Sequence, residues 1–299
     1  STRLIAVGDP MQAIYRFAGA NANSLDLIKQ ESETRGMSVT TLPLNVTYRC
    51  PVSVVELAQE WVPDFTAGEK NENGVVGVID HVEFFKQDWT GDNTNSVVLC
   101  RNTRPLVGIA QKLRRRGVPC VVEGSRGEGM LALAKKWGED ITFNEFRGKL
   151  AKHEEKQEMK AQENNSSPAK IADLHEKCDI LRDLCDGIEQ EWKEQRTDAS
   201  VPRVKDLMAR IEVLFLGGGD QTRVLKLCTI HRSKGREWKK VYLVGRNRYQ
   251  PSVWAKSAED LQQETNLMYV GVTRVKQELV EVEVPMKKNE STGLEWWQE

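Results

Sequence analysis

The feature that most constrains this chain is a pair of short apolar runs that flank a loop of charged residues and glycine. The first run lies in residues 225–230 (LKLCTI), and the second is residues 241–244 (VYLV). The loop between them is polar and carries His231, Arg232, Lys234, Gly235, Arg236 and Glu237. Such a loop at the mouth of a buried strand is typical of nucleotide and polyanion sites. The pattern predicts strand, loop and strand, although basic loops between strands are common.

The same alternation of strands and helices occurs in the first half of the chain. Apolar runs at residues 75–79, 97–100 and 118–122 predict strands, and residues 105–116 have the pattern of an amphipathic helix. A strand, helix and strand in this order are typical of a parallel sheet with helices on both faces. We therefore expect an α/β fold with a doubly wound parallel sheet.

Other segments extend this pattern. Residues 4–7 (LIAV) predict a strand, and we expect its neighbours to lie before residue 1 in a larger protein; an edge strand of a self-contained fold is the alternative. Residues 52–61 and 261–275 predict helices, and residues 278–284 predict the last strand. Three nearby glycines lack the GxxxxGK[ST] spacing of a phosphate-binding loop, so we expect a flexible turn at Gly124, Gly127 and Gly129.

Residues 131–219 have a different, helical character. Apolar residues alternate steps of three and four at Ile171, Leu174, Cys178, Leu181, Cys185, Ile188 and Trp192. Such a seam is typical of helices that pack side by side. We expect a helical insertion of about three helices. A turn at residues 164–168 favours an intramolecular antiparallel hairpin over a dimer, and glycines at 217–219 form a hinge back to the sheet.

Composition narrows the class of protein. Charged residues make up 29 % of the chain and the net charge is −1, so a nucleic-acid site has to be a local basic groove. No apolar run reaches the roughly 18–20 residues that span a membrane, and no signal peptide is visible; we expect a cytoplasmic location. The six cysteines form no CxxC pair, which favours buried thiols over disulfides or zinc. The tail at residues 286–299 is polar apart from Leu294, Trp296 and Trp297.

Four segments, in this order, resemble motifs III to VI of the UvrD/Rep/PcrA-like superfamily 1 DNA helicases. They are residues 8–20 (GDPMQAIYRFAGA), 44–51 (LNVTYRCP), 229–238 (TIHRSKGREW) with VYLV behind it, and 263–276 (QETNLMYVGVTRVK). The resemblance implies two RecA-like cores, of which this chain holds the edge of the first and all of the second. It divides the chain into a first-core remnant (1–40), second-core parts (41–130 and 220–299) and a helical insertion (131–219).

The resemblance also implies roles for single residues. Gln12 is expected to sense the γ-phosphate of ATP and its attacking water, and Tyr48 to stack on the base. Arg49 and Arg274 resemble the arginines that neutralise phosphate charge in the transition state. Gly235 and Glu237 belong to the nucleotide-binding set, Glu237 on the ribose or phosphate side. The candidate contacts to single-stranded DNA are Tyr15, Phe17, Arg101, Asn102, His231 and Arg232.

The family's phosphate loop and its acidic pair for Mg²⁺ precede motif III, and no GxxxxGK[ST] occurs in the 299 residues. We therefore expect the Mg²⁺ ligands outside this chain, no metal site within it, and little hydrolysis of ATP by the chain alone. The expected partners are single-stranded DNA, duplex junctions and a first RecA-like core. We expect a monomeric motor that acts in DNA repair or replication. The alternatives are an inactive helicase-like binding module, or the helicase part of a nuclease complex.

Where this chain departs from the family pattern, contacts with DNA are the less certain part of the resemblance. The family usually has an arginine in the motif III stretch where Ala18 stands, and K-G-L-E where Lys234-Gly235-Arg236-Glu237 stands. The family also favours E-E-R-R where residues 263–266 read QETN. The resemblance therefore supports the phosphate-sensing residues more firmly than the DNA contacts.

Overall fold

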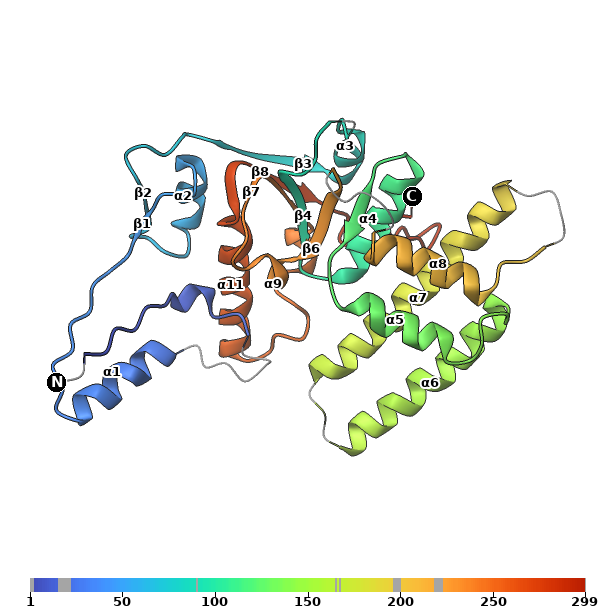
Figure 1. Cartoon of the computed structure of the whole chain (residues 1–299), viewed down its shortest axis with the longest axis horizontal. Coiled ribbons are helices and arrows are strands. Elements are labelled where there is room, and N and C mark those ends of the chain that lie inside the picture. The colour runs from blue at the N-terminus through green and yellow to red at the C-terminus, as the bar shows by residue number, and fades with distance from the viewer. Residues whose placement is uncertain are drawn as a thin grey trace. The chain divides into compact units, whose positions relative to one another are not determined.

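A computed structural model describes residues 3–15, 23–89, 91–164, 166, 168–195, 200–217 and 223–298, and the chain divides into two compact units. Unit 1 combines Ser1–His81 with Ile230–Val284, and unit 2 combines Val82–Thr229 with Pro285–Glu299. Neither unit is therefore continuous in sequence, as the colours in Figure 1 show. The division into a first-core remnant, two second-core parts and an insertion stays a prediction.

Unit 1 contains three parallel strands in the spatial order β3-β8-β7, with bounds Val75–Asp80, Val275–Glu283 and Trp238–Val244. A small parallel pair joins β1 (Val46–Thr47) to β2 (Thr66–Ala67). The helices of unit 1 are η1 (Pro10–Gln12), α1 (Ser24–Thr34), α2 (Val52–Ala58), α9 (Ile230–Ser233), α10 (Arg246–Tyr249) and α11 (Ala258–Val272).

The strands of unit 1 form because their apolar residues can be buried on both faces. The last four residues of β7 are all buried, a run typical of parallel strands rather than of an alternating half-buried one. Helix α11 begins with a capping box in which Ser257 accepts from the amide of Asp260. Its second half is buried continuously from Asn266 to Val272. The strands and α11 therefore share one core. Helix α11 lies on the path by which the chain returns from the carboxyl end of β7 to the amino end of β8 (Figure 1).

Unit 2 also contains parallel strands, in the order β4-β6-β5, with bounds Ser96–Cys100, Leu225–Thr229 and Cys120–Val122. Its helices are α3 (His81–Lys86, whose first residue belongs to unit 1), α4 (Thr103–Arg115), α5 (Arg126–Lys135), α6 (Phe143–Glu163), α7 (Pro168–Gln195) and α8 (Val204–Phe215). The expected α/β class with parallel strands is thus confirmed.

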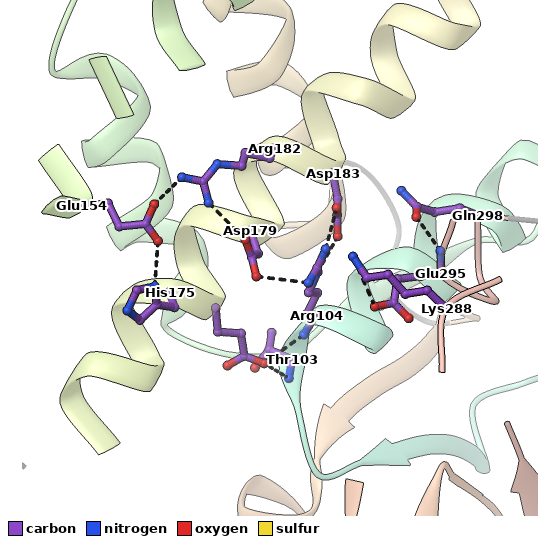
Figure 2. Close-up of polar contacts among 11 residues, drawn as sticks. Thr103, Arg104, Glu154, His175, Asp179, Arg182, Asp183, Lys288, Glu295 and Gln298 are labelled. Atoms are coloured by element: carbon purple, nitrogen blue, oxygen red, sulfur yellow. Dashed lines mark hydrogen bonds and ion pairs between the residues drawn. The ribbon is translucent and has the colours of Figure 1, made fainter. Parts of the chain in front are cut away.

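Helices α6 and α7 form the expected intramolecular hairpin. Arg147 near the start of α6 pairs with Glu189 near the end of α7, whereas Glu154 further along α6 pairs with His175 near the start of α7 (Figure 2 draws the second pair). The two helices are therefore antiparallel. The residues Cys178, Leu181, Cys185 and Ile188 are buried as the seam predicts.

The buried face of α7 is wider than that seam. Ile180 and Leu184 are also fully buried, while Ile171 and Trp192 at the ends are only half-buried. The reason is that α7 packs against α4, α5 and α8 as well as α6. A helix that meets neighbours on several sides buries more than the narrow stripe of a coiled coil.

Three expectations about local structure are wrong. Residues 4–7 form no strand: Leu4, Ile5 and Val7 are exposed, and none of the described strands pairs with them. Gly127 and Gly129 lie inside helix α5 and not in a turn. Glycine is needed at position 127 for packing, because a Cβ atom there would lie 2.6 Å from the Cβ atom of Phe215 of α8. Helix α11 ends at Val272 and β8 begins at Val275, earlier than expected.

The C-terminal tail is packed, not loose. Trp296 and Trp297 are buried in unit 2, and Trp296 lies 6.1 Å from Phe85 between ring centroids. A Cβ atom at Gly108 of α4 would lie 2.1 Å from Trp297 Cδ1, so glycine is required there. The tail therefore completes the core of unit 2. None of the helices in the described ranges is long and apolar enough to cross a membrane.

Candidate functional site

The segment that carries Gln12 is fixed to unit 1 by hydrogen bonds from α11 and from the loop after α9. Asn266 Nδ2 donates to the carbonyls of Pro10 at 2.9 Å and Ala13 at 3.1 Å, and Asn266 is buried. Lys234 Nζ donates to the carbonyl of Gln12 at 2.7 Å. These contacts hold both sides of the short helix η1. Lys234 thus gains a structural role that its sequence did not reveal.

The side chain of Gln12 is oriented from within the same turn. Its Nε2 donates to Asp9 Oδ2 at 2.7 Å, and Asp9 Oδ1 accepts from the amide of Met11 at 2.9 Å. Asp9 is therefore the N-cap of η1 and also the partner of the Gln12 amide. A γ-phosphate-sensing role for Gln12 stays a prediction, and it requires the amide to exchange Asp9 for another partner.

The candidate DNA contacts of unit 1 meet beside this turn. Tyr15 Oη donates to the carbonyl of His231 at 2.9 Å, and Lys234 Nζ lies 5.2 Å from the centroid of the Tyr15 ring. Arg232, on the same short helix α9, is exposed. Phe17 lies outside the described residues. The structure thus brings Tyr15 together with the polar loop after β6.

Arg49 lies at the start of α2 and faces Glu237. Thr47 Oγ1 accepts from the amides of Arg49 at 3.2 Å and Cys50 at 3.4 Å, which fixes the turn before the helix. Arg49 Nε donates to Glu237 Oε2 at 2.6 Å, and Lys276 Nζ pairs with the other carboxylate oxygen. Lys276, more than Arg49, holds the pKa of Glu237 below its usual value. An exposed ion pair of this kind is worth only about 0.2–1 kcal/mol.

Asn71 and Gly68 pack against the same turn, residues 47–50. Asn71 Nδ2 donates at 2.8 Å to each of the carbonyls of Thr47 and Cys50, which flank Tyr48 and Arg49. A Cβ atom at Gly68 would lie 2.7 Å from Tyr48 Cδ1. The Tyr48 ring nevertheless remains 83 % exposed, so its outer face is open to a stacking partner. Sequence reasoning missed Asn71, because a single asparagine in a loop has no distinctive pattern.

Arg274 is buried, in contrast to Arg49. It is 1 % exposed, and its guanidinium donates to the carbonyl of Val270 at 2.8 Å and to Thr273 Oγ1 at 3.1 Å. Burial, and next the positive charge of Arg49, lower the pKa of Arg274. The two arginines are therefore neighbours, but only Arg49 presents its guanidinium to solvent.

These side chains gather at the amino ends of strands β7 and β8, not at the carboxyl ends where ligands of open α/β sheets usually bind. Glu237 directly precedes β7, and Arg274 directly precedes β8. The amide of Trp238 donates to the carbonyl of Arg274 at 3.0 Å, which brings the two strand starts together. The reason is that α11 runs opposite to the strands, so the end of the helix lies at their amino edge.

Tyr269 of α11 lies between the two groups of candidate residues. Burial raises its pKa, as does the negative charge of Asp9, whereas the charges of Arg274 and Arg49 lower it. Tyr269 is thus close enough to feel the turn that carries Gln12 and the turn that carries Arg49. The segments resembling motifs III to VI therefore adjoin one another within unit 1.

Arg101 and Asn102 belong to unit 2, where they follow strand β4. Asn102 is the N-cap of α4, and the next two amides, of Thr103 and Arg104, donate to Glu176 Oε1 at 2.7 and 3.1 Å. This turn is organised by α7 of the same unit. The structure does not group Arg101 and Asn102 with the candidate residues of unit 1, and their contact with DNA stays a prediction.

The residues present fit a polyphosphate better than a metal ion. In the described part of the chain, no group of three or more His, Cys, Asp or Glu side chains could hold a metal. By contrast, Arg49 and Lys276 both pair with the carboxylate of Glu237, and the positive charge of Arg274 lies close to that of Arg49. Gly235, at a φ of 84°, allows the loop before Glu237 to turn, and no neighbouring atom crowds it.

Comparison with known proteins identifies the family. The UvrD-like helicase C-terminal domain family matches residues 125–282, which is more than half of the 299-residue chain. No curated protein matches the chain at a significant level. The match includes the segments resembling motifs V and VI and the α6–α7 hairpin, in agreement with the parallel α/β architecture. The chain therefore belongs to the UvrD-like helicase C-terminal domain family.

Proposed function

We propose that this chain is the C-terminal half of an ATP-dependent DNA helicase or translocase. In this proposal unit 1 supplies one wall of an ATP cleft, and a first RecA-like core with a phosphate loop and Mg²⁺ carboxylates supplies the other. The single observation that carries the proposal is that segments far apart in sequence meet here: Arg49 pairs with Glu237 and lies near Arg274, and Asn266 of α11 holds the turn that carries Gln12.

The residues divide the work on the nucleotide by their chemistry. Tyr48 offers an open aromatic face to the base, and the forked guanidinium of Arg49 suits two phosphate oxygens. Bound ATP supplies the anhydride whose hydrolysis drives movement along DNA. Positive groups that approach the γ-phosphate as the cores close act on the transition state more than on affinity.

Single-stranded DNA would be contacted on the side of Tyr15, His231 and Arg232. Tyr15 is 37 % exposed and is held by its hydroxyl group, so the ring can offer a stacking surface at low entropic cost. Arg232 is exposed beside it and can meet the phosphate backbone. The family membership makes contact with nucleic acid the expected use of this surface.

A helicase-like module that binds without turnover is the second candidate. One observation favours it: the guanidinium of Arg274 donates hydrogen bonds to carbonyl and hydroxyl groups of its own chain and is buried. For Arg274 to act in catalysis, the end of α11 must open when a nucleotide and the first core arrive. Arg49 needs no such rearrangement, because its pair with Glu237 is exposed.

Hydrolysis of ATP separates the two candidates. The measurement is DNA-stimulated ATP hydrolysis by the chain alone and by the same chain preceded by a first core with a phosphate loop. We expect negligible turnover by the chain alone and clear, DNA-dependent turnover by the completed protein. If the completed protein binds single-stranded DNA and nucleotide without hydrolysis, the motor proposal is wrong and the binding module stands. Turnover by the chain alone that no substitution of Arg49 affects would also contradict it.

A further inference from the structure

Two positive side chains share the single carboxylate of Glu237 at the amino ends of β7 and β8. Arg49 Nε meets one carboxylate oxygen at 2.6 Å, and Lys276 Nζ meets the other. The exposed fractions of the Arg49, Glu237 and Lys276 side chains are 40 %, 36 % and 44 %. All three are therefore accessible to a ligand from solvent.

The charges in this cluster do not balance. Arg274 adds a third positive charge close enough to lower its own pKa through repulsion by Arg49. One carboxylate thus pairs with two exposed cations, and Arg274 is a third positive charge nearby that is buried and donates to groups of its own chain. A nearby ion pair on the same two strands shows the contrast. Lys240 pairs with Glu278 at 2.9 Å, and no second cation shares that carboxylate among the ion pairs of the described residues.

We propose that Lys276 is a further phosphate-binding residue, and that Glu237 holds Lys276 and Arg49 as a stand-in anion that a polyphosphate displaces. The inference deepens the proposed function, on which it rests for the identity of the polyphosphate as a nucleotide. It differs from the role that the family resemblance implies for Glu237, which is a direct contact with the ribose or phosphate side. Lys276 was not among the residues that the sequence suggested.

The physical basis is competition between anions of different charge. A carboxylate carries one negative charge, whereas a triphosphate carries several and has many more acceptor oxygens. Ion pairs between exposed side chains are weak, so the exchange of Glu237 for a phosphate is favourable. The ammonium of Lys276 can rotate toward a new acceptor, and Arg49 can offer two parallel donors. Glu237 meanwhile keeps the two cations close together while the site is empty of anion.

Inorganic triphosphate is the suitable probe, because it has neither ribose nor base. The chain is titrated with it, and the side-chain NMR signals of Arg49 Nε and Lys276 Nζ are followed. We expect both signals to shift together as their pairs with Glu237 break. Lys276→Met should weaken triphosphate binding about five- to tenfold, the effect of losing one charge-assisted hydrogen bond at an exposed site. Lys276→Arg should restore most of the affinity.

Two further variants make the test specific. Lys240→Met removes a lysine that also forms a partly exposed ion pair between β7 and β8, and it should leave triphosphate binding unchanged. Glu237→Gln should strengthen triphosphate binding, because it removes the competing anion and keeps the shape of the side chain. If Glu237 were instead only a ribose contact, Glu237→Gln would weaken ATP binding and leave triphosphate binding unaffected. Circular dichroism of each variant checks that the fold is retained.

Three results would overturn the inference: no detectable binding of triphosphate, equal effects of Lys276→Met and Lys240→Met, or unchanged or weaker binding by Glu237→Gln. The outcome is independent of the proposed motor function. Triphosphate binding that depends on Lys276 in a chain whose completed form does not hydrolyse ATP would support the inference and contradict the motor. Hydrolysis by the completed protein, with triphosphate binding insensitive to Lys276, would do the reverse.

Discussion

Two groups of charged residues in this chain are built from similar side chains but differ in how fully the charges are matched. In unit 1, Arg49, Lys276 and Arg274 lie around one carboxylate, Glu237. In unit 2, acids outnumber the arginines, as Figure 2 shows for Arg104 and Arg182 among Glu154, Asp179 and Asp183. The first group has unused positive charge, and the second has none to offer a ligand.

The geometry of the pairs differs as well. Arg104 meets both oxygens of Asp183, at 2.7 and 2.9 Å, and meets Asp179 at 3.1 Å. The Arg104 side chain is only 21 % exposed and that of Asp183 13 % exposed. A two-pronged, half-buried pair resists exchange with water or with another anion, whereas the single exposed contact of Arg49 does not. The comparison teaches that charge in unit 2 holds helices together, while the exposed ion pairs of Glu237 in unit 1 contribute little to stability.

The largest expected effect is on the rate at which the cysteine thiols are modified, because that rate depends on how readily each unit opens. Burial raises the pKa of Cys100 and of Cys185 in unit 2 to about 12, against an ordinary value of 9.0. The reactive thiolate is therefore reduced by roughly a thousandfold at neutral pH. Burial also raises the pKa of Cys50 in unit 1, but the charges of Arg49 and Arg274 oppose the rise. We expect iodoacetamide to modify Cys50 first, as measured by mass spectrometry of peptides over time.

The modification is repeated over a series of urea concentrations. Equal rates of modification of Cys50 and Cys185 at every concentration would mean that the two units unfold together. The control is the fully unfolded chain, in which all six cysteines, buried and free in the structure, should react at similar rates.

Arg49→Ala should have the next largest effect and should act on turnover rather than on stability. In the completed protein we expect at least about a hundredfold loss of ATP turnover, since arginines of this type contribute about 10³–10⁵ in related phosphoryl-transfer systems. Stability should change little, because the pair with Glu237 is exposed. Single-turnover hydrolysis and urea unfolding measure the two effects. Normal hydrolysis by Arg49→Ala would remove this residue from the active site.

Arg104→Met, in unit 2, should by contrast act on stability rather than on turnover. Loss of one partner leaves Asp183 and Asp179 with less compensation in a half-buried position, and we expect destabilisation by about 2–3 kcal/mol. The midpoint of urea unfolding measures it. The matched control is Arg35→Met, which breaks an exposed pair with Glu31 and should cost below about 0.5 kcal/mol. If both variants unfold at the same urea concentration, the proposed contrast between the two groups of charges is wrong.

The smallest expected effect is on the titration of Glu237. Its folded pKa lies below the unfolded value, so its contribution to stability is present above the unfolded pKa and is lost as pH falls through the folded one. Because Lys276 is the main cause, Lys276→Met should raise the midpoint toward the unfolded value. Carboxyl-carbon NMR measures the midpoint. A midpoint that moves equally in Lys240→Met would show that only general charge is involved.

The sequence predicted the parallel strands and the α6–α7 hairpin because burial leaves a periodic trace. Strands β4, β5 and β7 are apolar runs, and the four central seam residues of α7 are buried. The same reasoning predicted that all six cysteines would be buried and free, and this is confirmed. It failed at residues 4–7, where an apolar run has none of the pairing that a strand requires.

The candidate site was less predictable than the fold, because similarity to a motif gives the identity of a residue but not the direction of its side chain. Arg49 and Arg274 were both expected to face a cleft, but Arg274 turns inward to the carbonyl of Val270. The supporting roles of Asn71 and Lys276 depend on which strand ends and loops meet in space. No local pattern encodes such meetings, so single residues of this kind are found only from coordinates.

The packing of Trp297 against Gly108 has a consequence for synthesis on the ribosome. Helix α4 emerges early, but the tail that covers it emerges only after residues 230–284, which belong to the other unit. Gly108 and Trp297 are 189 residues apart, so at about 5–20 residues per second this surface stays uncovered for roughly 10–40 seconds. During this time the apolar surface around Gly108 is not covered by the indole of Trp297. It can then bind chaperones or associate with other unfolded chains. Silent codon changes that slow translation between Thr229 and Trp296 would lengthen that exposure without altering the finished protein.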